Sequence, residues 1–385
     1  MTLAEILSND ELRRNEFPVM RDKIFLAHAG VCPLPRRVAD AISECARQST
    51  LGDQEAFMLH RLDVARKFGA QLLNCQPDEI ALVGPTSLAL SFVAAGLKLR
   101  YGDNILIYYD DYPSNVYPWI ALADKRSVGV EVRLLNTRGL GVIRPKDVEE
   151  HIDENTRLVA LASCHFISGF RLEHDAIGKF LRERGIWFCL DAIQTLGAFP
   201  TTVEHVDFLA ADAHKWLLGP CGAGLFYVRR ELQEKLNPPV YGWHNVRNPN
   251  FVAQEQIVFR PGALKYEAGT HNLVGLVGLI AAMELALETG IENIAAELLR
   301  KRALLVPALQ AKGLTVLNAD TKPENSSSIV SFFRPGKDLT PLHKKLADAG
   351  IVTSLRLDRK GQNYLRLSPH FYNTDAELNR LLELL

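Results

Sequence analysis

The sequence predicts an α/β protein, with a mostly parallel sheet between helices followed by a smaller α+β unit. Three observations support this prediction. Apolar, strand-like runs alternate with helical patterns from residue 80 to 228, which is typical of a parallel sheet covered on both faces. A chain of 385 residues exceeds what one hydrophobic core usually supports. From residue 291 the pattern changes to helix, strand, strand, helix, strand, strand, helix.

These elements divide the chain into three predicted parts. Residues 1–20 are expected to form an arm that packs with the small domain. A large domain, 21–285, begins with a short strand that ends at His28 and closes with a long apolar helix that should be buried. We place the boundary within that helix, near Leu285, so that 286–385 form the small domain.

The composition excludes several classes of partner. The net charge is -1, which gives no electrostatic reason to expect nucleic acid or an anionic membrane. No apolar run approaches the roughly 20 residues that span a bilayer, and the first residues are polar rather than signal-like. The 6 cysteines are scattered without a C-x-x-C pair, which argues against a zinc site or a disulfide framework. We expect a cytoplasmic protein without a metal site.

A possible anion site follows the strand predicted over 80–83. A Gly-Pro-Thr-Ser turn comes next and opens a helix over 88–97. The first N–H groups of a helix are unpaired, and the hydroxyls of Thr86 and Ser87 add donors, so the turn can bind a phosphate. The alternative is simple capping of the helix by Thr86 or Ser87.

Two later strands also end in polar residues. The strand over 104–109 precedes Tyr112, whose ring either covers a flat ligand or lies in the core. The strand over 186–190 delivers Asp191, and Gln194 follows it. The carboxyl end of a central parallel strand is where open α/β sheets bind ligands. A carboxylate buried there is costly unless it finds a cationic or N–H partner.

The strand over 206–211 ends in a polar cluster that contains His214 and Lys215. A lysine at the lip of a buried strand can form a Schiff base, because burial and neighbouring groups lower its pKa. From this stretch alone, the favoured interpretation of Lys215 is a surface lysine at a strand end. Asp191 at the preceding strand end changes this balance, since the two side chains can share one crevice. No G-x-G-x-x-G motif follows a first strand, so a nicotinamide enzyme is disfavoured.

Six motifs occur along the chain in one order: Gly-Pro-Thr-Ser, Asp-Tyr-Pro-Ser-Asn, Asp-Ala-Ile-Gln, Ala-His-Lys-Trp, Glu-Ala-Gly-Thr and Arg-Leu-Ser-Pro-His-Phe-Tyr-Asn-Thr. In this order they resemble the class V aminotransferase family of pyridoxal-phosphate enzymes of fold type I, a group that includes cysteine desulfurases and isopenicillin-N-epimerase-like proteins. The resemblance runs from His28 to the terminal helix. It implies a seven-stranded type of large-domain sheet, pyridoxal 5'-phosphate as cofactor and an amino acid as substrate.

The resemblance also implies roles at the cofactor. Lys215 would hold it as an aldimine and then move the substrate Cα proton. Asp191 would pair with the pyridine nitrogen, which makes the ring an electron sink. Gln194 would donate to the ring's phenolic oxygen, and Tyr112 would stack on the ring. The phosphate would be bound by Thr86, Ser87 and His214, although His214 is equally well explained as a packing neighbour.

Further roles concern substrate and partner. Arg366 would form a two-pronged ion pair with the substrate α-carboxylate. Arg356 lies in a loop-like run and is either a second substrate contact or, with better odds, a solvated side chain. His28 either faces the substrate or only fixes the N-terminal strand. In this family Thr270 reaches the phosphate of the neighbouring subunit, so a homodimer with shared sites is implied. The asparagine that often contacts the ring oxygen is missing near His165.

One departure from the family narrows the reaction. Cysteine desulfurases carry a nucleophilic cysteine on a loop shortly before the carboxylate-binding arginine, whereas residues 351–364 contain none. We therefore expect an aminotransferase-type enzyme, with an epimerase or a lyase as alternatives, and regard a desulfurase as disfavoured. A non-catalytic regulatory protein that binds the cofactor is the other hypothesis. The enzyme is favoured by the joint presence of Asp191, Gln194, Lys215 and Arg366.

Overall fold

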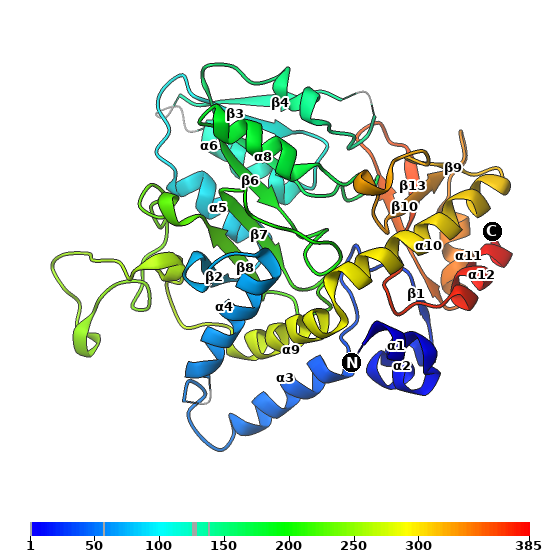
Figure 1. Ribbon diagram of the computed structural model, residues 1–385, viewed down its shortest axis with the longest axis horizontal. Coiled ribbons are helices and arrows are strands. Elements are labelled where there is room, and N and C mark those ends of the chain that lie inside the picture. The colour runs from blue at the N-terminus through cyan, green and yellow to red at the C-terminus, as the bar shows by residue number, and fades with distance from the viewer. Residues whose placement is uncertain (1, 57, 125–128, 138) are drawn as a thin grey trace.

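The computed structural model describes residues 2–56, 58–124, 129–137 and 139–385. Figure 1 shows a helix-covered sheet in one part of the molecule and a smaller unit, coloured orange and red, in the other. Helices α9 (Leu273–Thr289) and α10 (Ile291–Ala311) run between the two parts. This arrangement matches the predicted α/β unit followed by an α+β unit.

The central sheet contains seven strands in the order β2-β8-β7-β6-β5-β3-β4. All are parallel except β8, which is antiparallel to both of its neighbours. The predicted, mostly parallel sheet is therefore confirmed. Because β6 and β7 are adjacent and parallel, their carboxyl ends meet at one edge. The strands are β2 (Ile80–Val83), β3 (Asn104–Tyr108), β4 (Glu131–Leu135), β5 (Thr156–Ala162), β6 (Trp187–Asp191), β7 (Phe208–Asp212) and β8 (Gly224–Val228).

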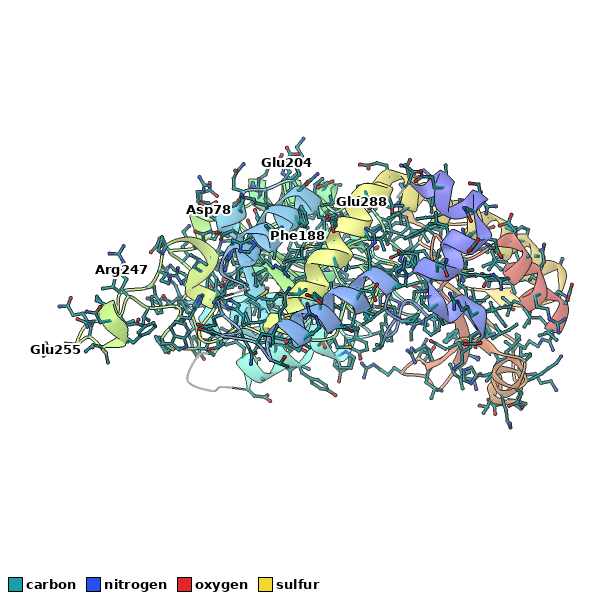
Figure 2. The ribbon with its side chains drawn as sticks, turned by 90° about the horizontal axis from the view of Figure 1, so that it is seen from below. Asp78, Phe188, Glu204, Arg247, Glu255 and Glu288 are labelled. Carbon is teal, nitrogen blue, oxygen red and sulfur yellow. The ribbon has the colours of Figure 1, made fainter. Side chains whose placement is uncertain are left out.

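Two hydrophobic cores lie on the two faces of this sheet, because successive strand residues point to opposite sides. Phe188 of β6 packs in one core with α4, α8 and α9, and the next residue, Cys189, packs in the other with α5 and α6. Figure 2 shows Phe188 within the body of the molecule and Arg247 near one end. The helices of this part are α3 (Arg36–Gln48), α4 (Leu59–Leu73), α5 (Thr86–Gly96), α6 (Tyr117–Ala123), α7 (Pro145–Glu149) and α8 (His174–Glu183).

The smaller unit is built on an antiparallel sheet of order β12-β13-β10-β9. It contains one more strand than predicted, because Thr353 alone separates β11 from β12. Strand β1 (Ile24–Phe25) pairs with β11, so the chain joins this unit directly after the N-terminal arm. The elements are β9 (Thr315–Val316), β10 (Val330–Phe333), α11 (Thr340–Asp348), β11 (Ile351–Val352), β12 (Ser354–Leu357), β13 (Asn363–Leu367) and α12 (Asp375–Leu384).

The chain bends by 77° between α9 and α10. Gly290 occupies the bend with φ +86, a conformation that side-chain-bearing residues rarely adopt. We propose Gly290 as the domain boundary, slightly later than the predicted position near Leu285. Within the described part of the chain, no single helix has the length and apolar character to cross a membrane. Only the bent pair α9–α10 passes that test, and only when the two helices are taken together.

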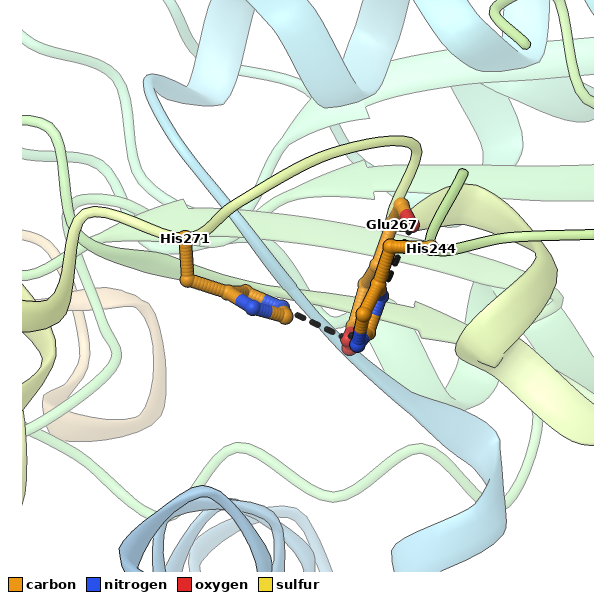
Figure 3. A group of neighbouring side chains, drawn as sticks. All are labelled: His244, Glu267 and His271. Carbon is orange, nitrogen blue, oxygen red and sulfur yellow. Dashed lines mark hydrogen bonds and ion pairs between the residues drawn. The ribbon is translucent and has the colours of Figure 1, made fainter. Parts of the chain in front are cut away.

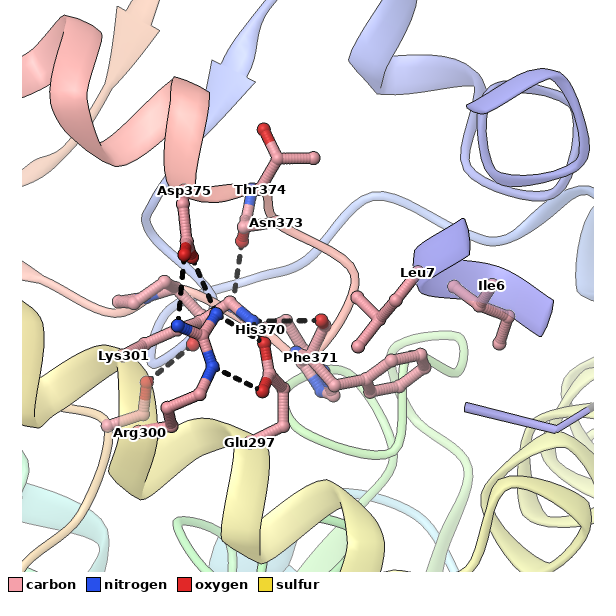
Figure 4. A network of polar contacts seen from close by, with 12 residues as sticks. Ile6, Leu7, Glu297, Arg300, Lys301, His370, Phe371, Asn373, Thr374 and Asp375 are labelled. Atoms are coloured by element: carbon pink, nitrogen blue, oxygen red, sulfur yellow. Dashed lines mark hydrogen bonds and ion pairs between the residues drawn. The ribbon is translucent and has the colours of Figure 1, made fainter. Parts of the chain in front are cut away.

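The N-terminal arm consists of α1 (Leu3–Ser8) and α2 (Asp10–Glu16). The Phe17 ring after it stacks on Tyr372, with ring centroids 4.0 Å apart. Figure 4 shows the arm beside the segment that leads into α12. Arg300 of α10 forms an ion pair with Asp375, the first residue of α12. These contacts support packing of the arm with the smaller unit. Short 3-10 helices lie at Pro18–Arg21, Pro77–Glu79, Pro113–Asn115, Arg230–Leu232, Pro249–Phe251, Gly262–Tyr266 and Pro323–Asn325.

Candidate active site

Lys215 lies in a tight turn that follows β7. Asp212, the last residue of β7, holds this turn, because its carboxylate accepts hydrogen bonds from Ala213 N at 2.6 Å and Gly222 N at 3.0 Å. The turn closes where Gly219 N donates to Ala213 O at 2.9 Å. The backbone around Lys215 is therefore fixed by its own polar groups.

The Lys215 amine is buried and lies over an aromatic ring. Lys215 is only 8% exposed, and its Nζ lies 5.2 Å from the centre of the Tyr112 ring. Burial lowers the pKa of Lys215 to about 8, the Asp191 charge opposes this, and the charges of Arg366 and Arg356 lower the pKa further. Roughly a tenth of the amine is therefore uncharged at pH 7, which supplies the free amine that a Schiff-base lysine requires.

Asp191 ends β6, directly beside β7. One carboxylate oxygen, Oδ1, accepts a hydrogen bond from Ile193 N at 3.1 Å, and the residue is only 2% exposed. No ion pair joins Asp191 to a cation in the described residues, and burial raises the pKa of Asp191. A buried carboxylate with so few partners fits a ligand that brings its own N–H cation, as a protonated pyridine does.

Gln194 has part of its hydrogen-bonding capacity left. Its Oε1 accepts from Trp216 Nε1 at 2.8 Å, and its Nε2 donates to Ala29 O at 3.1 Å. An amide nitrogen carries two hydrogens, so one N–H of Gln194 can still donate to a ring oxygen. The contact with Ala29 also fixes the N-terminal strand against the large domain.

The turn before α5 is not capped by its own side chains, contrary to the capping alternative for Thr86 and Ser87. Pro85 is the N-cap residue, and no side chain accepts a bond from the first turn of the helix. Thr86 Oγ1 instead accepts from Asp212 N at 3.0 Å, which ties the turn to β7. His214 Nδ1 lies 3.3 Å from Asp212 Oδ1 and joins the same cluster. The open helix N-terminus is suited to a phosphate.

Tyr112 is 46% exposed, so the alternative that its ring lies in the hydrophobic core is wrong. Its ring stands edge-on to Phe166, with centroids 5.3 Å apart. The residue before it, Asp111, is a member of the site that the sequence patterns did not reveal. Asp111 accepts from Tyr112 N at 2.7 Å, Asn115 Nδ2 at 3.0 Å and Ala162 N at 3.2 Å. The sequence signal for Asp111 was its position beside Asp110, shortly after the end of β3.

Arg366 is buried near Lys215, with 1% exposure. Its Nη1 donates to Phe166 O at 2.6 Å and its Nη2 to Ser354 Oγ at 3.4 Å, whereas Nε has no partner among the described residues. Burial lowers the pKa of Arg366 to about 9, and the nearby charge of Arg356 lowers it further. Spare donors and a destabilised charge suit a substrate carboxylate.

Arg356 was expected in a loop and, with better odds, in solvent, and both expectations are wrong. It lies within β12, because this segment pairs with β13 in the antiparallel sheet. The side chain is half-buried, and burial lowers its pKa. His165 is also turned inward, with Nδ1 bonded to Ser168 Oγ and Nε2 to Asp110 O, so it offers no nitrogen to a ring oxygen.

His28 does not support the predicted substrate contact. Its Nδ1 is bonded to Ser368 O at 2.9 Å and its Nε2 to the Tyr372 hydroxyl at 2.6 Å, and the side chain is fully buried. Burial lowers the pKa of His28 to about 3, so the ring is neutral. Both nitrogens serve to fix the N-terminal strand to the smaller unit, which was the alternative interpretation.

Thr270 is exposed on a loop that a buried carboxylate anchors. Glu267 accepts from Arg66 Nη2 at 2.6 Å, His271 Nε2 at 2.7 Å and Leu82 N at 2.8 Å. Figure 3 shows His244 and His271 around this carboxylate. The three side chains could surround a metal ion, but Arg66 already occupies the oxygen that faces His271. We therefore interpret Glu267 as the ionic anchor of the loop.

Comparison with known proteins decides the family. The model of the family "Aminotransferase class-V" matches residues 24–381. The chain belongs to the class V aminotransferase family. Its curated relatives include a probable cysteine desulfurase of Methanothermobacter thermautotrophicus, 29% identical over 97% of this chain and 96% of the relative. A probable cysteine desulfurase of Aeropyrum pernix is 30% identical, with 90% and 85% covered. An uncharacterized aminotransferase of Bacillus subtilis, YcbU, is 27% identical, with 97% and 96% covered.

Solved structures share the fold of this class V enzyme. The apo cysteine desulfurase of Thermococcus onnurineus NA1 has a TM-score of 0.89 at 24% identity, with 97% of this chain and 96% of that chain covered. The cystine C-S lyase C-DES, in complex with cysteine persulfide, has a TM-score of 0.86 at 21% identity, with 95% and 98% covered. The predicted fold type I is confirmed. A further C-DES structure carries glycine covalently linked to its pyridoxal-phosphate cofactor.

The class V enzyme is pyridoxal-phosphate-dependent, as the motifs predicted. The residues of this chain fit that cofactor on their own chemistry. A buried lysine of lowered pKa, a buried carboxylate that forms no ion pair among the described residues and an uncapped helix N-terminus lie at one edge of the sheet. These groups complement an aldehyde, a pyridine nitrogen and a phosphate in turn.

Proposed function

We propose that this class V enzyme acts on an amino acid through Lys215 and proton transfer at the substrate Cα, most simply as an aminotransferase. One observation carries the proposal. Lys215 and Asp191 lie at the carboxyl ends of adjacent parallel strands, and each is buried with a shifted pKa. Perturbed groups that converge at neighbouring strand ends in this way are characteristic of functional sites.

The residues around the ring position the cofactor in this proposal. Pyridoxal phosphate, when bound, supplies an aldehyde for covalent bonding to an amine and a ring that accepts electron density from the substrate Cα. Asp191 would hold a proton on the pyridine nitrogen, and Gln194 would donate its spare N–H to the phenolic oxygen. Tyr112 would cover the ring. The phosphate would be bound by Thr86, Ser87 and His214.

Lys215 would also transfer the proton. A pKa of about 8 lets Nζ accept a proton from Cα and return it within the same site. Arg366 would orient the substrate by binding its α-carboxylate, because Nε and part of the guanidinium remain free for a two-pronged contact. The Arg366 contact would thereby set the direction in which the Cα proton points.

Two relatives are named probable cysteine desulfurases, yet residues 351–364 of this chain carry no cysteine for persulfide transfer. The turn between β12 and β13 is short, and Arg359 in it binds Asp110 at 2.6 Å. Burial raises the pKa of Cys164 to about 11 and that of Cys32 to about 12. Cys221 is exposed, but its pKa is also raised. A thiolate is therefore disfavoured at each of these sulfurs.

The reaction type is tested with L- and D-amino acids added to the holoenzyme while the cofactor spectrum is followed. A keto acid released together with aminated cofactor supports the proposed transamination. Exchange of the Cα hydrogen with solvent deuterium, without amination, supports an epimerase instead. A keto acid released with ammonia supports a lyase. If no amino acid perturbs the spectrum, the proposal is wrong and a binding-only protein is favoured.

We also propose a homodimer in which Thr270 contributes to the neighbouring site. Thr270 lines one cavity with Gly84 and Leu88 of the phosphate turn, so the loop is close to a cofactor position. An arm over residues 241–260 extends from the large domain, with Glu255 near its tip in Figure 2. Apolar side chains that a second copy would cover are exposed along it: Tyr241, Trp243, Phe251, Val252, Ile257 and Val258.

Sedimentation of the purified protein tests the dimer. The double variant Phe251→Asp, Ile257→Asp should dissociate it, because charges would enter the buried interface. Tyr101→Asp is the matched control, since Tyr101 is 88% exposed outside the arm. A monomeric wild type, or a dimer that survives the double variant, would contradict this assignment.

A further inference from the structure

Two arginines point into the site from the same face of one hairpin. Ser354 of β12 lies opposite Arg366 of β13, and Arg356 lies opposite Tyr364. Residues two apart in a strand point to the same side, so Arg356 and Arg366 are diagonal neighbours on one face. Like charges in such positions repel each other, so this pair is unfavourable unless an anion lies between or beside them.

The two guanidinium groups converge on Gly30. A β-carbon built on Gly30 would lie 3.8 Å from Arg366 Nη2 and 3.9 Å from Arg356 Nη2. The two nitrogens are therefore no farther apart than the sum of these distances. Gly30 carries no side chain, which leaves the space in front of both arginines open to a small molecule.

No carboxylate of the described residues forms an ion pair with either arginine. Among the described residues, Arg356 donates only to the backbone oxygen of Leu355, and Arg366 donates only to Phe166 O and Ser354 Oγ. The charges of both arginines act on Lys215, and the Tyr112 hydroxyl lies near both guanidinium groups. Cys164 and His165 are the other titratable groups near Arg366. Arg366 is buried and Arg356 is half-buried, so holding both charges without a counter-ion is costly, and a ligand is a natural source of negative charge.

The single α-carboxylate of a substrate does not neutralise the charges of both arginines. Asp191 is committed to the pyridine nitrogen in the proposed function, which leaves two arginine charges for the substrate. Arg366 alone can take the α-carboxylate with its remaining donors. Arg356 then faces the same space, and no hydrogen bond within the described residues uses its Nη2, so another part of the substrate can bind there.

Resting on the proposed function, we propose that the substrate is an acidic amino acid and that Arg356 binds its second carboxylate. Arg356 is thus the residue that determines specificity, whereas Arg366 binds the carboxylate that all amino acids share. A site built to pair a buried cation rejects an uncharged analogue, because the cation is then left without a partner.

The test compares L-glutamate and L-aspartate with L-glutamine and L-asparagine, which match them in size and lack the second charge. Binding to the holoenzyme is followed by the cofactor spectrum. We expect the acids to bind at least about tenfold more tightly than the amides, which is the ratio that one charge-assisted contact supplies. Arg356→Gln should remove this preference by weakening the acids alone, and Arg356→Lys should keep part of it. Lys360→Gln, an exposed residue of the same hairpin, is the matched control.

Calorimetry with glutarate and butyrate separates this inference from the proposed function, since neither compound has an amine that can react. Glutarate should bind wild-type holoenzyme at least about tenfold more tightly than butyrate, and Arg356→Gln should abolish the difference. If Arg356→Gln weakens acids and amides equally, Arg356 serves the α-carboxylate and the inference is overturned. Equal binding of glutarate and butyrate by the wild type also overturns it. A silent cofactor spectrum with every amino acid contradicts the proposed function, whereas the glutarate result stands by itself.

Discussion

Asp111 and Asp191 are linked through a single residue, Ala162. The Ala162 amide donates to Asp111 Oδ2 at 3.2 Å, and Ala162 is the register partner of Asp191 between β5 and β6. Burial raises the pKa of Asp111 to about 7, and the charge of Asp191 contributes to this rise. The carboxylate proposed to hold the pyridine nitrogen therefore has a second acid behind it, which also fixes the loop that carries Tyr112.

Replacement of Asp111 by alanine should destabilise the protein by about 2 kcal/mol or more. The substitution leaves the amides of Tyr112 and Ala162 and the side chain of Asn115 without their acceptor, and each buried unsatisfied group costs about 1–3 kcal/mol. Chemical denaturation of the apo-protein measures the change. Asp124→Ala, at an exposed helix end, is the control. Equal stability of the two variants would show that the loop does not depend on Asp111.

Loss of the Glu267 carboxylate should destabilise the protein by about 3–5 kcal/mol, because buried Arg66 would keep only the exposed Asp63 carboxylate as an ionic partner. Glu267→Gln should recover part of the stability through its amide oxygen, and Glu255→Ala in the exposed arm should be neutral. Denaturant titration supplies these values. A Glu267→Ala variant as stable as the Glu255→Ala variant would refute the anchor.

The same carboxylate predicts an acid-labile contribution to stability. Burial tends to raise the pKa of Glu267, but the His271 hydrogen bond and the Arg66 charge outweigh it and lower the pKa below 4.5. The unfolded state therefore binds the proton first as pH falls. The contribution is complete above the unfolded value and is lost as pH falls through the folded one. Stability curves of wild type and Glu267→Gln should converge in acid. Parallel curves down to the lowest pH would argue against this pairing.

No cysteine should be required for turnover. Cys221→Ser and Cys164→Ser should retain the reaction rate found with the preferred amino acid, because neither sulfur favours the thiolate. Mass spectrometry of the enzyme after incubation with L-cysteine should find no persulfide on the chain. A persulfide on Cys221, together with loss of turnover in Cys221→Ser, would favour a desulfurase.

Cofactor uptake should depend on pH through Lys215. The rate of covalent attachment to apo-protein should rise with pH through a midpoint near 8, where half of the amine is uncharged, and level off above that midpoint. Asp191→Asn should move the midpoint to lower pH, since the Asp191 charge raises the pKa of Lys215. Borohydride trapping at timed intervals gives the rates. A midpoint near 10.5, the ordinary value for lysine, would mean that the amine is not buried in solution.

The parts of this site that follow a strand could be predicted from sequence, because alternating apolar runs locate strand ends. Lys215, Asp191 and the turn at Thr86 were placed at strand ends in this way, whereas their proposed roles at the cofactor came from the family resemblance. Contacts between distant segments left no such signal. His28 looked available until Ser368 and Tyr372 were seen to occupy both of its nitrogens. The position of Arg356 also depended on pairing with β13, which turned an expected loop into a strand and brought its charge beside Arg366.

The central claim is that Lys215 carries the cofactor, and peptide mapping tests it most directly. Holoenzyme is reduced with borohydride, digested and analysed by mass spectrometry, with Lys265→Ala as a control for a second buried lysine. The phosphopyridoxyl group should be found on Lys215 in wild type and in Lys265→Ala, and should be absent from Lys215→Ala. Attachment to another lysine while Lys215 remains unmodified would contradict the proposed site.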